Sequence, residues 1–404
     1  MESTNKGRLS NKKIIIGITG SIAAYKTASL VSMLVKNKAE VHTIMTQNAT
    51  KFISPLTFET LTGNKCHTDT FDLSEDHKVH HITLVKNCDI FLIAPATANI
   101  IAKVVHGIAD DMLTSTFIAC HSKKMISPAM NTFMYENPIT QDNINLCKKY
   151  NIKVIEPSSG RLACGDEGKG KMPEPEFLFD EIVYEICYKK DLINHKILVT
   201  AGPTQEAIDP VRYITNHSSG KMGYAIAQIA ANRGAEVILI SGNVNLKKPN
   251  HVKVINIISA KEMFEEVKKV CNDCDIIIKA AAVADYKPKF YVDEKIKKKD
   301  ENMSIELEKT DDILKYLGEN KKEGQKLIGF SMETSDLIEN SKKKLVKKNL
   351  DMVVGNNLKD KGAGFGTDTN LVTLITNKDV KQLPLMSKEN VANEIFNEIL
   401  SWDK

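Results

Sequence analysis

The sequence predicts an α/β protein with two doubly wound domains whose sheets are mostly parallel. Short apolar, β-rich runs alternate along the chain with amphipathic stretches of helical period, which is the pattern of βαβ units. The same pattern restarts near the middle of the 404-residue chain. At roughly 150 residues per domain, this length suits two or three domains.

The first domain is expected over residues 1–190. Ser21–Lys36 has helical period and follows the first strand candidate. The crossovers between its parallel strands should be right-handed. Because parallel strands run in one direction, their carboxyl ends should lie at one edge of the sheet, where open α/β sheets bind ligands. The strand candidates are Lys12–Thr19, Glu40–Met45, Asp89–Ala94 and Lys124–Ser127.

The second domain is expected over residues 191–404, with the boundary in the charged stretch around Tyr184–Asn194. Met222–Arg233 is its first helix candidate. A strand that runs into a glycine turn and a helix begins each half, so both domains are predicted to be Rossmann-like. The strand candidates are Lys196–Thr200, Glu236–Ser241, Asp275–Lys279, Lys326–Phe330 and Met352–Gly355.

Composition narrows the class of protein. Hydrophobic residues make up 42% and charged residues 26% of the chain, as in ordinary globular proteins. The formal net charge of +4 does not demand a nucleic-acid partner. No apolar run is long enough to span a membrane, and Met1–Lys13 lacks the apolar core of a signal peptide. A cytoplasmic location is therefore expected.

Cysteines and histidines predict no metal site. The eight cysteines fit free thiols of a cytosolic chain better than a disulfide framework. Cys271 and Cys274 form a CxxC without a second ligand pair, and they are expected where a helix ends and a strand begins. His77, His80 and His81 have no carboxylate or cysteine at ligand spacing.

Four segments of the first half carry site chemistry. Gly17–Ser21 is a strand end and glycine turn that opens a helix, where backbone N–H groups and the helix dipole favour a phosphate. Taken alone, it fits a ligand-free turn equally well. Pro95–Asn99 and Pro128–Met134 follow two further strands. Gly160–Asp166 is a glycine-flanked loop whose cysteine, Cys164, fits either a proton-delivering lid or a spectator thiol.

These four segments, in this order, resemble the homo-oligomeric flavin-containing cysteine decarboxylases, and among them those acting on phosphopantothenoylcysteine. The resemblance implies that His81 assists oxidation of the substrate thiol by FMN, Asn131 binds the substrate carboxylate and Cys164 protonates the product. It also implies trimers with FMN at the subunit interface. The FMN-binding residues that it implies are Gly17, Gly20, Ser21, Thr46, Pro95, Thr97 and Asn99.

Two tempting nucleotide motifs in the second half fail. Ser218–Lys221 is not a P-loop, because Thr215 and Met222 stand where the motif requires Gly and Ser or Thr. Gly362–Gly366 precedes the strand candidate Leu371–Thr376, whereas a dinucleotide fingerprint must open a helix.

Other segments indicate a nucleotide site. Ala280–Tyr286 follows a strand with small residues that allow a flat base to approach. Lys295–Lys298 comes next, and Lys344 and Lys348 are spaced to share one helix face. Such lysines can bind a polyphosphate, but on the lysines alone a solvated face is the better explanation.

With Thr200–Thr204 and Asp209–Gly223, these segments resemble the phosphopantothenate–cysteine ligases over about Lys196–Thr376. The resemblance implies activation of a carboxylate by CTP as an acyl-cytidylate, with Mg²⁺ bridging phosphates, and then attack by cysteine. It assigns Arg212 and Asn216 to the conversion of the acyl-cytidylate. The nucleotide-binding residues that it implies are Asp285, Lys295, Asp312, Ile313, Phe330, Lys344 and Lys348.

The chain departs from the family pattern at Thr310–Asp312, which lacks the usual proline before the aspartate. Both motif sets together resemble the bifunctional proteins of coenzyme A biosynthesis, which implies decarboxylase trimers and ligase dimers that combine into a dodecamer. Two alternatives stay open: a flavin-dependent decarboxylase of another substrate fused to a dehydrogenase-like nucleotide domain, and a non-catalytic regulatory flavoprotein. Retention of His81, Asn131 and Cys164 favours catalysis over the latter.

Overall fold

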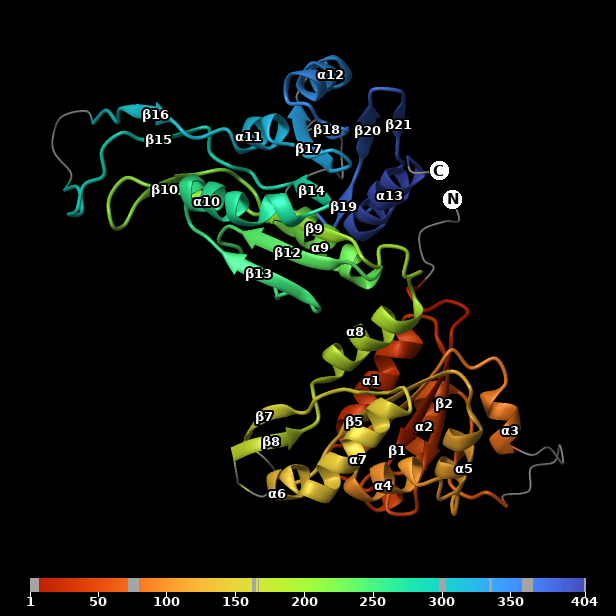
Figure 1. Cartoon of the computed structure of the whole chain (residues 1–404). Helices are drawn as coiled ribbons and strands as arrows, with labels where there is room; N and C mark the ends of the chain where they lie inside the picture. Colours follow the sequence, from red (N-terminus) through yellow and green to blue (C-terminus); the bar gives the residue numbers. More distant parts are fainter. Residues whose placement is uncertain are drawn as a thin grey trace. The chain divides into compact units, whose positions relative to one another are not determined.

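The computed structural model describes residues 7–71, 80–161, 165, 167–297, 303–333, 336–357 and 366–402. Its contacts divide the chain into two compact units, Met1–Lys189 and Lys190–Lys404, which Figure 1 draws from red to yellow-green and from green to blue. Each unit is a mostly parallel sheet covered by helices on both faces, so the predicted fold class is confirmed. In the described part of the chain, no helix is long and apolar enough to cross a membrane.

The first unit holds one sheet of parallel strands in the order β3-β2-β1-β4-β5-β6. The order reverses beside β1, which creates the switch point where such folds bind ligands. The near-continuous apolar runs found in the sequence follow from burial on both faces. The strands are β1 (Lys13–Ile18), β2 (Glu40–Met45), β3 (Cys66–His67), β4 (Ile90–Ala96), β5 (Lys123–Pro128) and β6 (Ile152–Val154).

Helices cover both faces of this sheet (Figure 1). Helices α1, α2 and α8 pack on the face to which Ile14 and Ile16 of β1 point. Helices α3, α4, α5 and α7 pack on the face of Ile15, as expected from the alternation of side chains in a strand. The helices are α1 (Ala24–Lys36), α2 (Pro55–Thr62), α3 (His80–Val85), α4 (Ala98–Val105), α5 (Met112–Ala119), α6 (Thr132–Glu136), α7 (Pro138–Lys149) and α8 (Pro175–Ile186), with the 3₁₀ turn η1 (Ala49–Lys51).

Two local features of the first unit matter for the site. Helix α1 begins at Ala24, three residues later than predicted, because Ser21–Ala23 form a turn in which the Ser21 carbonyl accepts from the Ala24 N–H. After the sheet, β7 (Ser158–Arg161) and β8 (Glu167–Lys171) form an antiparallel hairpin.

The second unit has an eight-stranded sheet in the order β13-β12-β9-β14-β17-β18-β20-β21. It is parallel from β13 to β18, and β20 and β21 add antiparallel strands at one edge. The strands are β9 (Lys196–Ala201), β12 (Glu236–Ser241), β13 (Val252–Asn256), β14 (Ile276–Lys279), β17 (Lys326–Glu333), β18 (Met352–Asn357), β20 (Val372–Thr376) and β21 (Val380–Gln382).

Helices α10, α11 and α12 contribute to the core on one face of this sheet, and α9 and α13 pack against each other, with α9 also contacting β9 and β12. Cys271 and Cys274 lie between α10 and β14, as predicted. The helices are α9 (Lys221–Asn232), α10 (Ala260–Val270), α11 (Ile313–Glu319), α12 (Leu337–Lys347) and α13 (Lys388–Ser401), with the 3₁₀ turn η2 (Cys271–Asp273).

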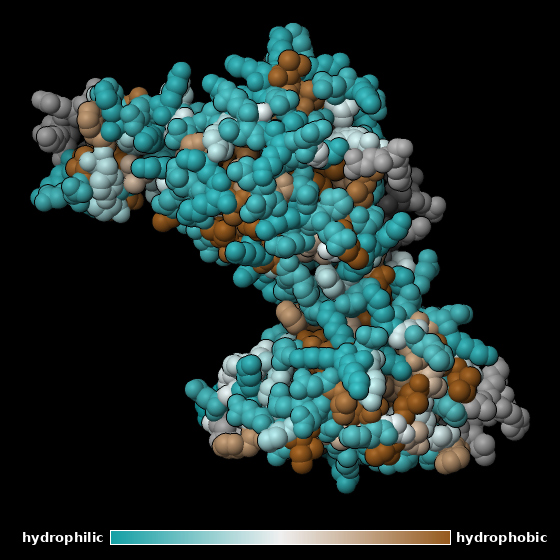
Figure 2. Space-filling model, viewed as in Figure 1, coloured by the Kyte–Doolittle hydropathy of each residue, from teal (hydrophilic) through white to brown (hydrophobic). Residues whose placement is uncertain are grey.

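Three short strand pairs complete the second unit. The pair β15 (Tyr286–Pro288) and β16 (Leu307–Lys309) forms an arm that extends from the body of the unit in Figure 1. Its exposed apolar residues include Phe290 and Tyr291, and brown atoms mark apolar residues on this arm in Figure 2. The other pairs are β10 (Gln205–Ala207) with β11 (Tyr213–Thr215), and β19 (Thr369–Asn370) with β22 (Met386–Ser387).

Candidate active sites at the sheet edges

The turn after β1 and the loop after β4 are tied together at the carboxyl edge of the first sheet. The Thr19 hydroxyl donates to the Pro95 carbonyl at 2.7 Å and accepts from the Thr97 N–H at 3.2 Å. A Cβ at Gly20 would lie 2.7 Å from the Cβ of Asn48, so the turn after β1 passes too close to the loop after β2 for a larger residue. The structure therefore brings four predicted flavin-site residues to one edge: Gly20, Ser21, Pro95 and Thr97.

Gly17 lies in the strand, in agreement with the predicted strand Lys12–Thr19. In β1 it is paired with Ile44 and Ile93. A Cβ on Gly17 would lie 2.5 Å from Cδ1 of Leu113. Close packing of α5 on the sheet explains this glycine without a ligand.

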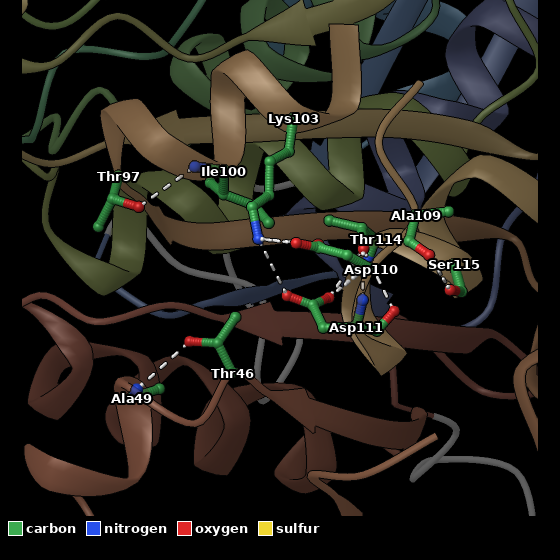
Figure 3. Close-up of polar contacts among 10 residues, drawn as sticks. All are labelled: Thr46, Ala49, Thr97, Ile100, Lys103, Ala109, Asp110, Asp111, Thr114 and Ser115. Carbon is green, nitrogen blue, oxygen red and sulfur yellow. Dashed lines mark hydrogen bonds and ion pairs between the residues drawn. The ribbon is translucent and has the colours of Figure 1, made fainter. Parts of the chain in front are cut away.

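The hydroxyls of Thr46 and Thr97 accept hydrogen bonds from backbone N–H groups at the same edge (Figure 3). Thr46 follows β2, and its Oγ1 accepts from the Ala49 N–H at 3.3 Å. Thr97 caps α4, accepting from the Ile100 N–H at 3.4 Å. These bonds hold the loops in place, and each hydroxyl oxygen keeps further hydrogen-bonding capacity for a ligand.

An ion pair closes the loop between α4 and α5. Lys103 Nζ lies 2.8 Å from Asp110 and 3.9 Å from Asp111 (Figure 3). Asp111 also caps α5 in a capping box with Thr114. The predicted residue Asn99 is exposed in the first turn of α4, in reach of solvent at this edge.

A pocket of about 540 Å³ joins the start of α1 to the loop after β5. Asn131 lies in its wall, half-buried, with its side-chain oxygen accepting from the Phe133 N–H at 2.8 Å. An amide N–H group can donate a hydrogen bond to an anion. The other lining residues include Ser21, Ile22, Tyr25, Ala129, Arg161 and Lys171.

The β7–β8 hairpin is docked on the loop that carries Asn131. The Met130 N–H donates to the Gly170 carbonyl at 3.0 Å. A Cβ on Gly170 would lie 2.2 Å from the Met130 carbonyl oxygen, and one on Gly168 would lie 2.5 Å from Oγ1 of Thr132. The hairpin therefore lies directly against the loop. Cys164 is in the connection of this hairpin and lies outside the described residues.

Lys26 binds the segment that follows strand β8 of the hairpin. Its side chain is only 8% exposed, and its Nζ donates to the Met172 carbonyl at 3.2 Å and to Glu174 at 2.8 Å. A buried ammonium needs such partners. Lys26 is therefore a structural cation at the base of the pocket.

The structure does not bring His81 to the Asn131 pocket within one chain. His81 lies in the first turn of α3, which packs on α5, and Leu84 of α3 belongs to the core on the Ile15 face of the sheet. The start of α1, which lines the pocket, belongs to the opposite face.

At the second sheet, Asn216 reaches the segment after β14. Its amide nitrogen donates to the carbonyls of Ala282 at 3.3 Å and Val283 at 3.1 Å. The hydroxyls of Thr200 and Thr204 hold the same segment by accepting backbone N–H groups at 3.3 and 3.0 Å. Two predicted elements, the loop of Asn216 and the segment Ala280–Tyr286, are thus adjacent.

Arg212 connects its own loop to the loop that contains Ile296. Its guanidinium contacts Asp209 at 3.2 Å and the Ile296 carbonyl at 3.1 Å. Burial would raise the pKa of Asp209, but N–H groups of Val211, Ile296 and Arg212 donate to the carboxylate and hold the pKa below its ordinary value. Arg212 therefore fixes the loop that contains Lys295.

Lys344 and Lys348 lie together near α11. Lys344 Nζ donates to the Phe330 carbonyl at 2.7 Å, and Lys348 forms an ion pair with Asp312. Burial alone would raise the pKa of Asp312, but the hydrogen bond from Lys348 and a backbone N–H hold it below its ordinary value. Lys348 is the C-cap of α12, so the predicted shared helix face holds only approximately.

Thr310 positions the loop that lacks the proline. Its hydroxyl donates to the Ala284 carbonyl at 2.6 Å, and its N–H donates to the Asp285 carbonyl at 3.0 Å. Asp312 then caps α11, and Ile313 is buried as the first residue of that helix. These two hydrogen bonds of Thr310 hold the start of α11, with Asp312, against the segment that ends with Asp285.

Sequence reasoning missed Lys279, the last residue of β14. Asp285, Asp312, Lys344 and Lys348 are all close enough to influence its charge. A signal existed in the sequence, because Lys279 directly follows three isoleucines of a buried strand. Among the described residues, no group of three or more His, Cys, Asp or Glu side chains is arranged to hold a metal ion.

Comparisons with known proteins agree with this division. Residues 2–187 match the family model "Flavoprotein", and residues 192–402 match the model of the DNA/pantothenate metabolism flavoprotein C-terminal domain. The chain is 46% identical to the coenzyme A biosynthesis bifunctional protein CoaBC of Bacillus subtilis over 98% of both chains. The same protein of Borreliella burgdorferi is 46% identical over 96% of this chain and 98% of its own.

A further relative carries a different name. A cysteine/cysteine sulfinic acid decarboxylase from an unknown prokaryotic organism is 44% identical over 86% of this chain and 99% of its own length. Its extent means that it too spans both units.

Proposed function

The chain belongs to the family of bifunctional coenzyme A biosynthesis proteins, and we propose that it joins cysteine to 4'-phosphopantothenate and then decarboxylates the product. It is an enzyme of coenzyme A biosynthesis with a decarboxylase and a ligase activity. The observation that carries the assignment is identity of 46% over 98% of both chains, which spans both sheet edges.

In the first unit, the pocket at Asn131 is the proposed decarboxylase site. We propose that FMN lies along the edge formed by Gly20, Ser21, Thr46, Thr97 and Asn99, where it supplies the redox chemistry. Small residues, hydroxyls and an exposed amide are the groups that a flavin nucleotide needs around its phosphate and ring. The family match to flavoproteins supports this choice.

The chain's own residues have separate tasks there. The amide N–H groups of Asn131 bind the substrate carboxylate until carbon dioxide leaves. Arg161 and Lys171 line the same pocket and supply positive charge for an anionic substrate. Cys164, carried by the docked hairpin, donates a proton to the product.

The ligase site is proposed at the edge of the second sheet. Asp285 and Phe330 hold the nucleoside of CTP, with Asp312 and Ile313 beside them, and Lys344 and Lys348 contact its phosphates. Lys295 reaches the phosphates from the loop that Arg212 and Asp209 fix. A carboxylate is a poor electrophile, so the acyl-cytidylate makes amide formation possible. Mg²⁺ bound with CTP would neutralise charge on the phosphates, and Asn216 serves the attack of cysteine.

A homo-oligomer is part of the proposal. Ile22 and Tyr25 line the Asn131 pocket although they are 56% and 61% exposed, as expected if another subunit covers them. A trimer would also supply His81 from a neighbouring subunit. The apolar arm at Phe290 and Tyr291 suits a dimer contact of the ligase units. Trimers and dimers together give a dodecamer, and light scattering of the purified protein measures its mass. We place this assembly in the cytoplasm.

One incubation tests the main proposal. The purified protein, 4'-phosphopantothenate, cysteine, CTP and Mg²⁺ should give phosphopantetheine, CMP, pyrophosphate and carbon dioxide. Mass spectrometry would detect the organic products. A protein that releases no CMP, or that stops at phosphopantothenoylcysteine with FMN bound, would contradict the assignment of the corresponding unit.

The relative named as a cysteine or cysteine sulfinic acid decarboxylase supports one alternative, in which the decarboxylase unit acts on another substrate. Its substrates lack the phosphopantothenoyl part. Competition between phosphopantothenoylcysteine and free cysteine as decarboxylation substrates separates the two. We expect the phosphorylated substrate to be strongly preferred, since Arg161 and Lys171 line the pocket.

A further inference from the structure

Lys279 ends a strand that is otherwise fully apolar. It follows Ile276–Ile278 in β14, which are buried. Because side chains alternate along a strand, Lys279 points to the same face as Ile277. That face packs against α10, α11 and α12. The lysine is therefore directed toward the helices that carry the proposed phosphate-binding residues.

The flanking strands offer it no charged partner. Its register partners are Thr200 of β9 and Gly329 of β17. A Cβ on Gly329 would lie 2.9 Å from Leu350 and 3.2 Å from Leu314, so hydrocarbon packs closely beside the lysine.

The charged neighbours are two lysines and two carboxylates. Lys344 and Lys348 come from α12 and its cap, Asp312 precedes α11, and Asp285 follows β14. Both neighbouring lysines already have partners, since Lys344 donates to a carbonyl and Lys348 pairs with Asp312. Within the described part of the chain, Nζ of Lys279 makes no hydrogen bond or ion pair.

This environment destabilises the ammonium form of Lys279 in the absence of ligand. Burial lowers its pKa to about 8; the positive charge of Lys344 and Lys348 adds to this lowering, and Asp312 and Asp285 oppose it. If Lys279 had only a structural role, it would be expected to form an ion pair with Asp312. That carboxylate is instead paired with Lys348.

We infer that Lys279 is an additional phosphate-contacting residue of the nucleotide site, acting beside Lys344 and Lys348. This inference rests on the proposed use of CTP. The triphosphate would bring the negative charge that the site lacks around Lys279. Since an anion stabilises the ammonium form, CTP binding should be accompanied by proton uptake near pH 8.

Calorimetry of the full-length protein tests this directly. CTP with Mg²⁺ is titrated at pH 8.0 in two buffers that differ in ionisation enthalpy, and the difference in observed heat gives the protons taken up. A group half protonated before binding takes up at most about 0.5 proton per site. Lys279→Met keeps the length of the side chain and removes its charge. We expect CTP affinity at pH 7 to fall about 10- to 100-fold, the scale of a hydrogen bond to a charged group, and the proton uptake to fall with it.

Two further variants sharpen the result. Lys279→Arg, a permanent cation, should keep much of the affinity while losing the proton uptake. Lys253→Met makes the same substitution at an exposed position of the edge strand β13 and should change neither quantity. Circular dichroism and thermal unfolding of each variant report that the second unit is folded.

The outcomes separate the two claims. If the wild type binds CTP and Lys279→Met binds it with the same affinity and the same proton uptake, the inference is wrong and the proposed function stands. If the wild type does not bind CTP at all, both fail.

Discussion

Lys26 is buried and Lys279 is half-buried at the carboxyl side of a parallel sheet, and their surroundings differ. Lys26 donates to the Met172 carbonyl and to Glu174, so its charge is neutralised by its own chain. Lys279 has two lysines and two carboxylates near it and no bonded partner among the described residues. The first edge is complete as folded, whereas the second holds excess positive charge that suits a polyphosphate.

The loops at both edges are held by threonine hydroxyls, and the second edge adds a buried carboxylate. Around the first sheet, hydroxyls of Thr19, Thr46 and Thr97 hold neighbouring backbone groups. Around the second, hydroxyls of Thr200, Thr204 and Thr310 do the same. The buried carboxylate of Asp209 also connects two loops there, together with Arg212. A flavin needs position above all, and an activated carboxylate needs counter-charge, so each edge suits the chemistry proposed for it. The following predictions test this difference, beginning with the largest expected effect.

Asn216→Asp should stall the ligase. The amide donates to two carbonyl oxygens, those of Ala282 and Val283, and a carboxylate there would repel both oxygens and the anionic acyl phosphate. We expect amide formation to fall about 100- to 1,000-fold, as for loss of a transition-state donor. Pyrophosphate release should fall less, so mass spectrometry should detect accumulated acyl-cytidylate.

The control for this variant is Asn272→Asp, the same change on an exposed turn, which should leave both half-reactions unchanged. Decarboxylation of supplied phosphopantothenoylcysteine should also persist in Asn216→Asp. Normal amide formation by the variant would remove Asn216 from the reaction.

Gly170→Ala should disable the decarboxylase alone. Its Cβ would lie 2.2 Å from the Met130 carbonyl oxygen, so the hairpin must shift away from Asn131. A displacement of about 1 Å at a catalytic group costs roughly 100-fold in rate. Turnover of phosphopantothenoylcysteine measures the loss, and CTP-dependent ligation is the internal reference.

Gly160→Ala distinguishes the clash from backbone strain. Gly160 has φ +147, close to the φ +141 of Gly170, but nothing lies within 4 Å of its added Cβ. A much smaller loss of decarboxylation is expected from Gly160→Ala. Equal losses in both variants would show that strain, and not the fit of the hairpin on its loop, controls the rate.

Lys26→Met should lower the stability of the first unit. The substitution keeps the hydrocarbon but removes the donor to the Met172 carbonyl and Glu174, which costs about 1–3 kcal/mol in urea unfolding. Lys171→Met is the matched control, because Lys171 lies 3.6 Å from the same glutamate and is 41% exposed. Its effect should be about 0–1 kcal/mol. Similar effects for the two lysines would mean that burial does not distinguish them.

Asp312→Asn should have the smallest effect, and it should depend on pH. The folded pKa of Asp312 is lowered, so its contribution to stability is present above its unfolded pKa and is lost as pH falls through the folded value. Because the side chain is 49% exposed, the pair contributes about 0.5–1 kcal/mol. Wild type and variant should differ at pH 7 and converge as the pH falls below the lowered pKa of the folded Asp312 carboxyl. A constant difference across that range would contradict the role of the ion pair.

The strands were predictable because burial on both faces demands continuous apolar runs. Lys12–Thr19 and Lys196–Thr200 were expected as strands, and β1 and β9 match them within one or two residues. The arm of β15 and β16 was not predicted, because its short antiparallel strands have neither strong alternation nor a tight turn between them.

The sites were predictable to the level of segments. Asn216 and Ala282 lie 66 residues apart in sequence, and only folding shows that they touch. Gly17 was expected to serve a ligand at the end of its strand, but close packing of Leu113 from a later helix already requires a glycine there. Lys279 looked like the polar end of a strand, since nothing local shows that four charges gather around it.

The order of strands bears on how the chain can fold during its synthesis. In the first sheet β2 and β3 are added on one side of β1, and β4, β5 and β6 on the other; in the second, β12 and β13 flank β9 on one side and the later strands follow on the other. Each strand leaving the ribosome thus meets a free edge and never has to be inserted between two strands already paired. The first sheet ends at Val154, before the second begins at Lys196, so one sheet can be complete while the other is still being translated.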